Sequence, residues 1–207
     1  RAALETLAPV DDALPLKKMM QGDASLQIQD YTRAQKYYDA VAKVEDARGS
    51  ARAHSFLSRV LAAPAHIDSI DEEMSNLIEA HPNSTDVLHI GALIKAIAAQ
   101  QQESNKKRKD LEAQSDKRFS QALSAADFDA PILFDRCRVF ARRGELERAY
   151  RSCQDAHQLV KDNVPGEVTR ADVMAQMGKH EEAISAMMSL DKLTERENIT
   201  VRVALAR

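Results

Sequence analysis

Two stretches decide the fold: residues 141–149 are ARRGELERA, and residues 175–183 are AQMGKHEEA. Gly144 and Gly178 stand 34 residues apart in them, and other residues keep the same spacing. The matching pairs are Pro131 and Pro165, Ala141 and Ala175, Glu147 and Glu181, Ala149 and Ala183, and Leu159 and Leu193. Self-similarity at a fixed period of this length is typical of stacked helical hairpins. The sequence therefore predicts an all-α solenoid in which each glycine supplies the positive φ of a tight turn.

Composition agrees with a helical domain and excludes several classes of protein. Apolar residues make up 44% of the chain and charged residues 29%, which is ordinary globular usage. The formal net charge is -3, whereas nucleic-acid-binding domains are usually strongly basic, so we expect no nucleic-acid partner. The apolar stretch 90–99, broken by Lys95, is far shorter than the ~20 residues that span a bilayer, so we expect no membrane insertion.

The sequence does not decide between a cytoplasmic and a periplasmic location. The chain starts at Arg1 with neither Met nor an apolar signal region. Earlier removal of a targeting segment or of a longer amino-terminal part is therefore an open alternative.

Extending the period from the two clear repeats organises most of the chain as one α-solenoid over residues 15–207, after an N-terminal segment 1–14. The predicted helix pairs are 15–50, 51–84, 85–129, 130–163 and 164–197. Residues 198–207 are expected to begin a further first helix. Because such an array would stop inside a helix, we expect further sequence beyond Arg207.

The unit 85–129 exceeds the period, so both of its helices are expected to be longer than the others. Its middle contains a basic cluster, Lys106 to Lys109, beside a run of Gln and Glu. Such charge blocks usually form an exposed hairpin tip. The alternative is a docking knob for an acidic partner.

The units resemble tetratricopeptide repeats (TPR) over about residues 15–197. The segments that carry the resemblance are Gly144 to Ala149 followed by Cys153 and Ala156, Gly178 to Ala183 followed by Met187 and Leu190, and Asp30 to Ala34 with Tyr38. The sequence departs from the family at Ile70 and Ser115, where the family prefers Ala, and in having no Trp. The resemblance implies a right-handed superhelix whose first helices line a concave groove that holds a peptide or a partner's helix.

Carrying the family's inward-facing positions onto this chain gives the candidate groove. They are Arg52, Phe56, Arg59, His89, Ile90, Leu93, Phe134, Asp135, Arg138, Arg142, Thr169 and Asp172. Arginine forks onto carboxylates and phenylalanine supplies apolar anchoring, which suits an acidic or carboxylate-ended peptide. The Asn and Lys set with which some members clamp a carboxy terminus is not reproduced. A groove that is merely solvated is the alternative.

No catalytic or metal-binding pattern stands out, so we expect no enzyme activity, no cofactor and no metal. The sequence has no Gly-rich phosphate cradle, and His180-Glu181-Glu182 lacks the second His, one helical turn on, that zinc hydrolysis needs. The other histidines are scattered without ligand spacing.

Cys137 and Cys153 fall on the two helices of one hairpin, at similar distances from Gly144. Antiparallel helices could bring them within disulfide range. Two buried thiols that act as small apolar residues are the favoured interpretation, with a disulfide as the alternative. A disulfide would indicate an oxidising compartment.

These observations favour a non-catalytic scaffold or adaptor that binds another protein through the groove. Two alternatives stay open. One is self-association through the long hairpin or the carboxy-terminal end. The other is a regulatory or docking arm of a larger enzyme or of a secretion or assembly complex.

Overall fold

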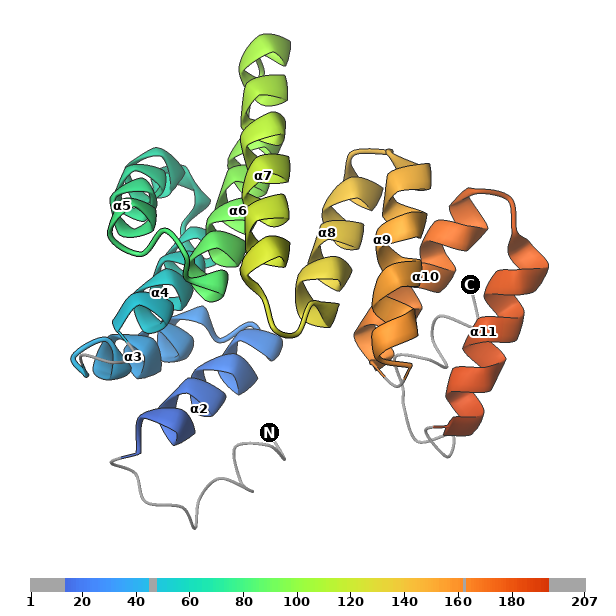
Figure 1. Cartoon of the computed structure of the whole chain (residues 1–207), viewed down its shortest axis with the longest axis horizontal. Helices are drawn as coiled ribbons and strands as arrows, with labels where there is room; N and C mark the ends of the chain where they lie inside the picture. Colours follow the sequence, from blue (N-terminus) through green and yellow to red (C-terminus); the bar gives the residue numbers. More distant parts are fainter. Residues whose placement is uncertain (1–13, 45–47, 162, 194–207) are drawn as a thin grey trace. The chain divides into compact units, whose positions relative to one another are not determined.

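The computed structural model describes residues 14–44, 48–161 and 163–193 (Figure 1). Every regular element in these ranges is a helix, which confirms the predicted all-α helical solenoid fold. In chain order the helices are α2 (Pro15–Gln27), α3 (Tyr31–Val41), α4 (Arg48–Ala62), the 3-10 turn η2 (Pro64–His66), α5 (Ile67–Ala80), α6 (Thr85–Gln100), α7 (Asn105–Ala125), α8 (Ala130–Arg142), α9 (Leu146–Leu159), α10 (Val164–Gln176) and α11 (His180–Leu193). None of these described helices is both long and apolar enough to cross a membrane.

The chain forms two compact units, residues 1–125 and 126–207, each with a hydrophobic core of its own. In the first unit α3 packs on α2 and α4, while α6 packs on α4, α5 and α7. In the second unit α9 packs on α8 and α10, and α10 also contacts α8 and α11. One continuous solenoid over residues 15–207 stays a prediction. Residues 1–13 and the further helix expected at 198–207 lie outside the described residues.

The glycine turns of the second unit are built by backbone hydrogen bonds that repeat with the period. Gly144 and Gly178 have φ of 75° and 79°. After α8, the N–H of Glu145 donates to the carbonyl of Phe140 at 3.0 Å, and that of Gly144 to Ala141 at 3.0 Å. After α10, the N–H of Lys179 donates to the carbonyl of Met174 at 2.9 Å, and that of Gly178 to Ala175 at 3.0 Å. This is the Schellman motif, whose left-handed residue is most easily glycine.

Hairpin α2–α3 is held by a close approach of its two helices. Tyr38 is fully buried, and its hydroxyl donates to Oδ1 of Asp23 at 2.7 Å. A Cβ atom added to Gly22 would stand 2.4 Å from Cε1 of this ring, so only glycine fits there. Burial, followed by the bond to Asp23, raises the pKa of Tyr38 well above its ordinary value. The hydroxyl therefore remains a hydrogen-bond donor at physiological pH.

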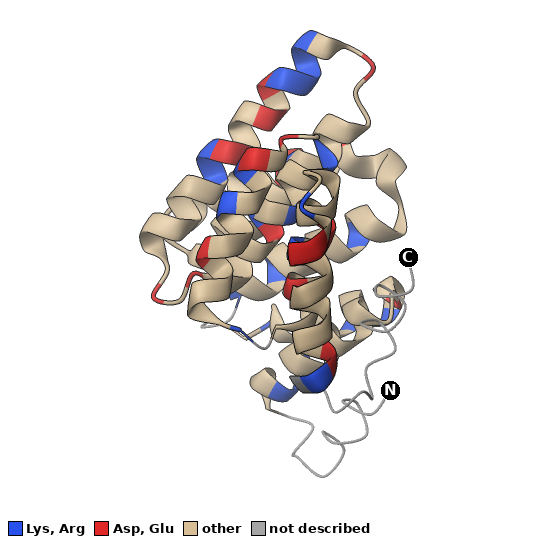
Figure 2. Cartoon of the chain, turned by 90° about the vertical axis from the view of Figure 1, so that its right-hand side faces the viewer, with Lys and Arg blue, Asp and Glu red and all other residues tan. Residues whose placement is uncertain are grey.

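Hairpin α6–α7 is the long one: α7 has 21 residues, whereas α5, α9 and α11 have 14 each. The carboxy-terminal half of α7 packs on α6 through Phe119 and Ala122. Ser115 is buried at a position where an alanine was expected, because its hydroxyl donates to the carbonyl of Ala92 at 2.9 Å. Residues 105–110 are exposed, and the free end of the hairpin carries the basic cluster, drawn in blue in Figure 2.

Candidate binding surface

The first-helix surface of the first unit is centred on α4. Arg52, Phe56 and Arg59 follow one another at i, i+4 and i+7 and therefore share one face of this helix. The guanidinium carbons of Arg52 and Arg59 lie 5.7 and 5.4 Å from the centroid of the Phe56 ring. At these distances the ring attracts and orients both cations.

The two arginines differ in what else they contact. Arg59 donates from two nitrogens to the carboxylate of Glu73 on α5, at 3.0 and 2.8 Å. These bonds hold the pKa of Glu73 below its ordinary value, against the opposing effect of partial burial. Arg52 is exposed, and no carboxylate in the described part of the chain lies within ion-pair distance of it. Its charge helps to lower the pKa of Glu73 without forming an ion pair, and its guanidinium nitrogens remain available to an external carboxylate.

The remaining predicted residues of this unit lie on α6. His89 and Leu93 are half-buried, and Ile90 is buried in the core. The ring of His89 lies 6.1 Å from that of Phe119 on α7. Helices α4 and α6 contact each other, and Leu93 packs against the core cluster that contains Phe56.

The prediction that Phe56 and Phe134 anchor a partner is wrong for these rings. Phe56 is 5% exposed and belongs to the core of α4, α5 and α6. Phe134 is 1% exposed and lies against Gly166, where an added Cβ would stand 2.3 Å from its Cε1. The first helices of consecutive hairpins touch here, so large side chains at these positions fill the interior instead of a groove.

In the second unit the predicted surface lies on α8 and α10. Arg138 is exposed and pairs with Asp135 one turn earlier, at 2.8 Å. Arg142, in the last turn of α8, is exposed, and no ion pair joins it to another described residue. On α10, Asp172 is exposed, while the hydroxyl of Thr169 donates to the carbonyl of Pro165 at 2.9 Å.

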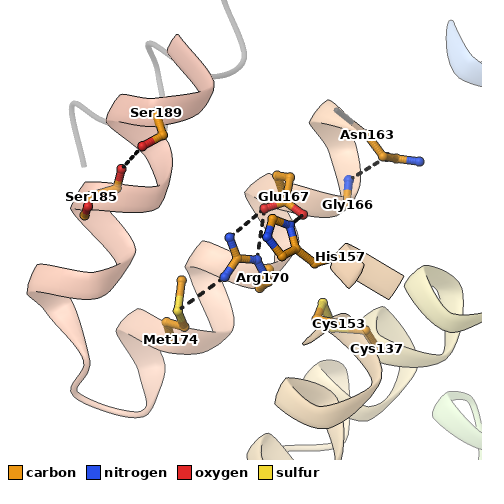
Figure 3. Close-up of polar contacts among 10 residues, drawn as sticks. All are labelled: Cys137, Cys153, His157, Asn163, Gly166, Glu167, Arg170, Met174, Ser185 and Ser189. Carbon is orange, nitrogen blue, oxygen red and sulfur yellow. Dashed lines mark hydrogen bonds and ion pairs between the residues drawn. A yellow bond between two sulfur atoms is a disulfide. The ribbon is translucent and has the colours of Figure 1, made fainter. Parts of the chain in front are cut away.

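Cys137 and Cys153 form a disulfide in this structure, with an S–S distance of 2.07 Å and Cα atoms 5.3 Å apart (Figure 3). Both residues are fully buried where α8 crosses α9. The favoured interpretation, two free thiols, is wrong for this structure, and the alternative, a disulfide, is present. The spacing had left the disulfide open, but it could not give the distance between the two helices.

A polar cluster in the second unit was not foreseen from the sequence. Glu167, 5% exposed in the first turn of α10, accepts hydrogen bonds from Nε and Nη2 of Arg170, at 2.9 and 2.7 Å (Figure 3). Nδ1 of His157, at the end of α9, lies 2.7 Å from its other oxygen. The cluster lines a hollow of about 710 Å³ together with residues of α11. The only local signal was the i, i+3 pairing of Glu167 with Arg170, since His157 comes from the preceding hairpin.

A second unforeseen network joins three helices of the first unit. Lys95 on α6 pairs with Asp71 on α5, and Arg118 on α7 donates to the carbonyl of Gly91 at 3.1 Å. Burial lowers the pKa of the Arg118 guanidinium. Across the described residues, no group of three or more His, Cys, Asp or Glu side chains is placed to hold a metal ion.

Comparison with solved structures identifies the fold. One similar structure is that of a thermophilic TPR protein from Thermus thermophilus. The alignment covers 93% of this chain and 97% of that protein's chain, with a TM-score of 0.77 at 17% sequence identity. The fold is that of a tetratricopeptide-repeat protein. YrrB, described as a TPR protein with an unusual peptide-binding site, matches 99% of this chain and 98% of its own, with a TM-score of 0.56 at 10% identity. A chain of the Cut9–Hcn1 hetero-tetramer is also similar. The alignment covers 99% of this chain but only 38% of that longer chain, with a TM-score of 0.57 at 13% sequence identity.

These identities establish the TPR fold alone, and at that level the predicted resemblance is confirmed. No sequence model of a protein family and no curated protein sequence matches the chain. The partner must therefore be argued from the residues of the surface itself.

Proposed function

We propose that this chain is a non-catalytic protein-binding scaffold whose first-helix surfaces bind a carboxylate-bearing peptide or helix of a partner. The observation that carries the proposal is the state of Arg52. Its guanidinium is oriented over Phe56, exposed, and not paired with a carboxylate of the described chain. An arginine held in this way loses little conformational freedom when a partner carboxylate binds.

The neighbouring groups favour the same class of partner. Arg59 is already neutralised by Glu73, so it shapes the surface and does not compete for the partner's carboxylate. Half-buried Leu93, which packs against the core cluster that contains Phe56, offers apolar contact. In the second unit, Arg142 repeats the chemistry of Arg52 as an exposed arginine without an ion-pair partner among the described residues.

The fold supports a role in protein interaction, since YrrB is described as having a peptide-binding site. Recognition of a helix or an extended peptide on a helical scaffold is a common use of such surfaces. The partner proposed here is narrower: it carries a carboxylate that binds an exposed arginine, with apolar side chains next to that carboxylate.

The experiment compares captured proteins for three versions of the full chain immobilised in native lysate. The test variant is Arg52→Glu with Arg142→Glu, which leaves the Arg59–Glu73 and Arg138–Asp135 pairs intact. The control is Lys36→Glu with Arg151→Glu, which makes the same charge change on exposed positions of second helices. Circular dichroism first establishes that all three fold.

We expect a specific protein to be captured by the wild type and the control and lost by the test variant. Its dissociation constant, measured with purified components, should rise by about ten-fold or more, because a hydrogen-bonded charge pair contributes about 1.5–3 kcal/mol. If all three versions captured the same proteins, the proposal that the partner binds through Arg52 and Arg142 would be rejected.

A further inference from the structure

The free end of the long hairpin carries an unusual concentration of charge. The four consecutive cations are Lys106, Lys107, Arg108 and Lys109, which lie within the first five residues of α7 and are all exposed. Blue ribbon marks the Lys and Arg residues near this end of the hairpin in Figure 2. We refer to these four residues as the basic tip. None of them forms an ion pair with a carboxylate in the described ranges, and Arg108 only donates to Oδ1 of Asn105, at 3.0 Å.

The position of the basic tip is unfavourable for the helix that carries it. The amino-terminal end of a helix bears a partial positive charge, so cations there are destabilising and acidic residues are preferred. The first turn of α7 contains no acidic residue. The tip also contributes no burial, since residues 105–110 are all exposed. Sequence choices that break a local rule without a structural gain are expected at functional sites.

We propose that the basic tip is a second docking surface, which binds a short run of carboxylates in an acidic segment of a partner protein. The extra length of α7 supports this role because it carries the four cations beyond the part of the helix that packs on α6. The tip is independent of the surface around Arg52 and does not rest on the function proposed for it.

The surroundings of the tip favour a protein segment over nucleic acid or a membrane. Glu103, Asp110 and Glu112 flank the four cations in sequence, so the positive region is short and bounded by carboxylates. A continuous polyanion would meet repulsion at both borders, whereas a peptide can place its own cations there. Residues 100–118 contain no aromatic side chain for base stacking. None of these residues is an exposed large apolar side chain that could enter lipid.

The test uses the full chain and two synthetic peptides of identical composition. The matched probe has four consecutive glutamates flanked on each side by two lysines, and the scrambled probe alternates the same residues. The tip variant carries Lys106→Gln, Lys107→Gln, Arg108→Gln and Lys109→Gln. The control carries Lys36→Gln, Lys43→Gln, Lys117→Gln and Arg151→Gln, which removes the same charge from separate exposed positions. Glutamine is chosen because its helix propensity is close to that of lysine and arginine.

We expect the wild type and the control to bind the matched probe more tightly than the scrambled one. The tip variant should bind the matched probe about ten-fold more weakly or worse, and its melting temperature should equal or exceed that of the wild type. Equal loss in the control, equal binding of the two probes, or a lower melting temperature of the tip variant would overturn the proposal. Tighter binding to single-stranded RNA or to vesicles of anionic lipid than to the matched probe would also overturn it.

Discussion

Hairpins α2–α3 and α8–α9 fill the same position of their helix crossing in two different ways. Gly22 and Tyr38 are 16 residues apart in the first hairpin, and Cys137 and Cys153 have the same separation in the second. In the first, a full-sized ring occupies the space left by a missing side chain. In the second, two side chains of equal size share the space and are joined covalently.

Hairpin α10–α11 uses a third combination. Ala171 and Met187 have the same separation and lie together in the core of that hairpin. In each hairpin the pair is placed identically with respect to the turn residue of positive φ, which is Gln29, Gly144 or Gly178. The crossing therefore takes a small residue with a large one, or two of middle size, because the helices must remain at close-packed distance. The disulfide is one of these solutions, and its effect on stability can be separated from the packing.

The largest expected effect is the loss of the disulfide. Reduction should lower the free energy of unfolding by about 3 kcal/mol, the value for a closed loop of about 15 residues. Urea unfolding of the full chain, followed by circular dichroism with and without reductant, measures it. The control is Cys137→Ala with Cys153→Met, which grafts the pair of α10–α11 and should not respond to reductant. If the urea midpoint of the wild type were the same with and without reductant, the disulfide would contribute nothing to the free energy of unfolding.

The next effect tests the glycine of the first crossing. Gly22→Ala should destabilise the chain by about 1–3 kcal/mol, because the new Cβ overlaps the Tyr38 ring. Adding Tyr38→Met to it reproduces the pair of α10–α11, although it removes the hydroxyl bonded to Asp23. We expect the double variant to be more stable than the sum of the two single changes predicts. Strict additivity in the same urea experiment would mean that the two residues do not compete for one space.

Sequence could predict the parts of the fold that the 34-residue period repeats. The glycine turns and the small residues Ala149 and Ala183 follow directly from it, and both alanines are buried against the partner helix. The first hairpin was harder to place because Gln29, with φ of 61°, occupies the turn position that glycine marks elsewhere. The backbone conformation is the same, but the residue that would signal it is missing.

The binding surface could be predicted only in part. The period places residues on the inner face of a first helix, but it does not say which of them touch the neighbouring helix. Phe56 and Phe134 are buried for this reason, whereas Arg52 and Arg142 are exposed. The cluster of His157 with Glu167 joins two hairpins across a turn, and no pattern within one repeat encodes such a contact.

A smaller effect separates the turn from the crossing. Gly178→Ala should destabilise the second unit by about 1 kcal/mol, because alanine disfavours the left-handed conformation. No atom lies within 4 Å of the added Cβ, so overlap cannot contribute. Gly144→Ala has equal room and provides the matched comparison. Equal losses in urea would assign the cost to the backbone alone, and a smaller loss at Gly144 would show that the disulfide holds that turn.

The smallest expected effect is a gain of stability at the turn that lacks a glycine. The N–H of Asp30 donates to the carbonyl of Ser25 at 2.9 Å, and that of Gln29 to Leu26 at 3.0 Å, which is the bonding found after α8 and α10. Gln29 therefore holds a left-handed conformation that costs a non-glycine residue about 1–2 kcal/mol. Glycine would relieve this strain but lose more chain entropy on folding, so Gln29→Gly should gain about 0.5 kcal/mol.

The gain should appear as a higher urea midpoint with an unchanged slope, since no buried surface changes. Gln27→Gly, in the last turn of α2, is the matched control and should lose stability, because glycine is unfavourable within a helix. If Gln29→Gly also lost stability, the first hairpin would not share the turn of the other two. The common geometry of the three crossings would then have to come from packing alone.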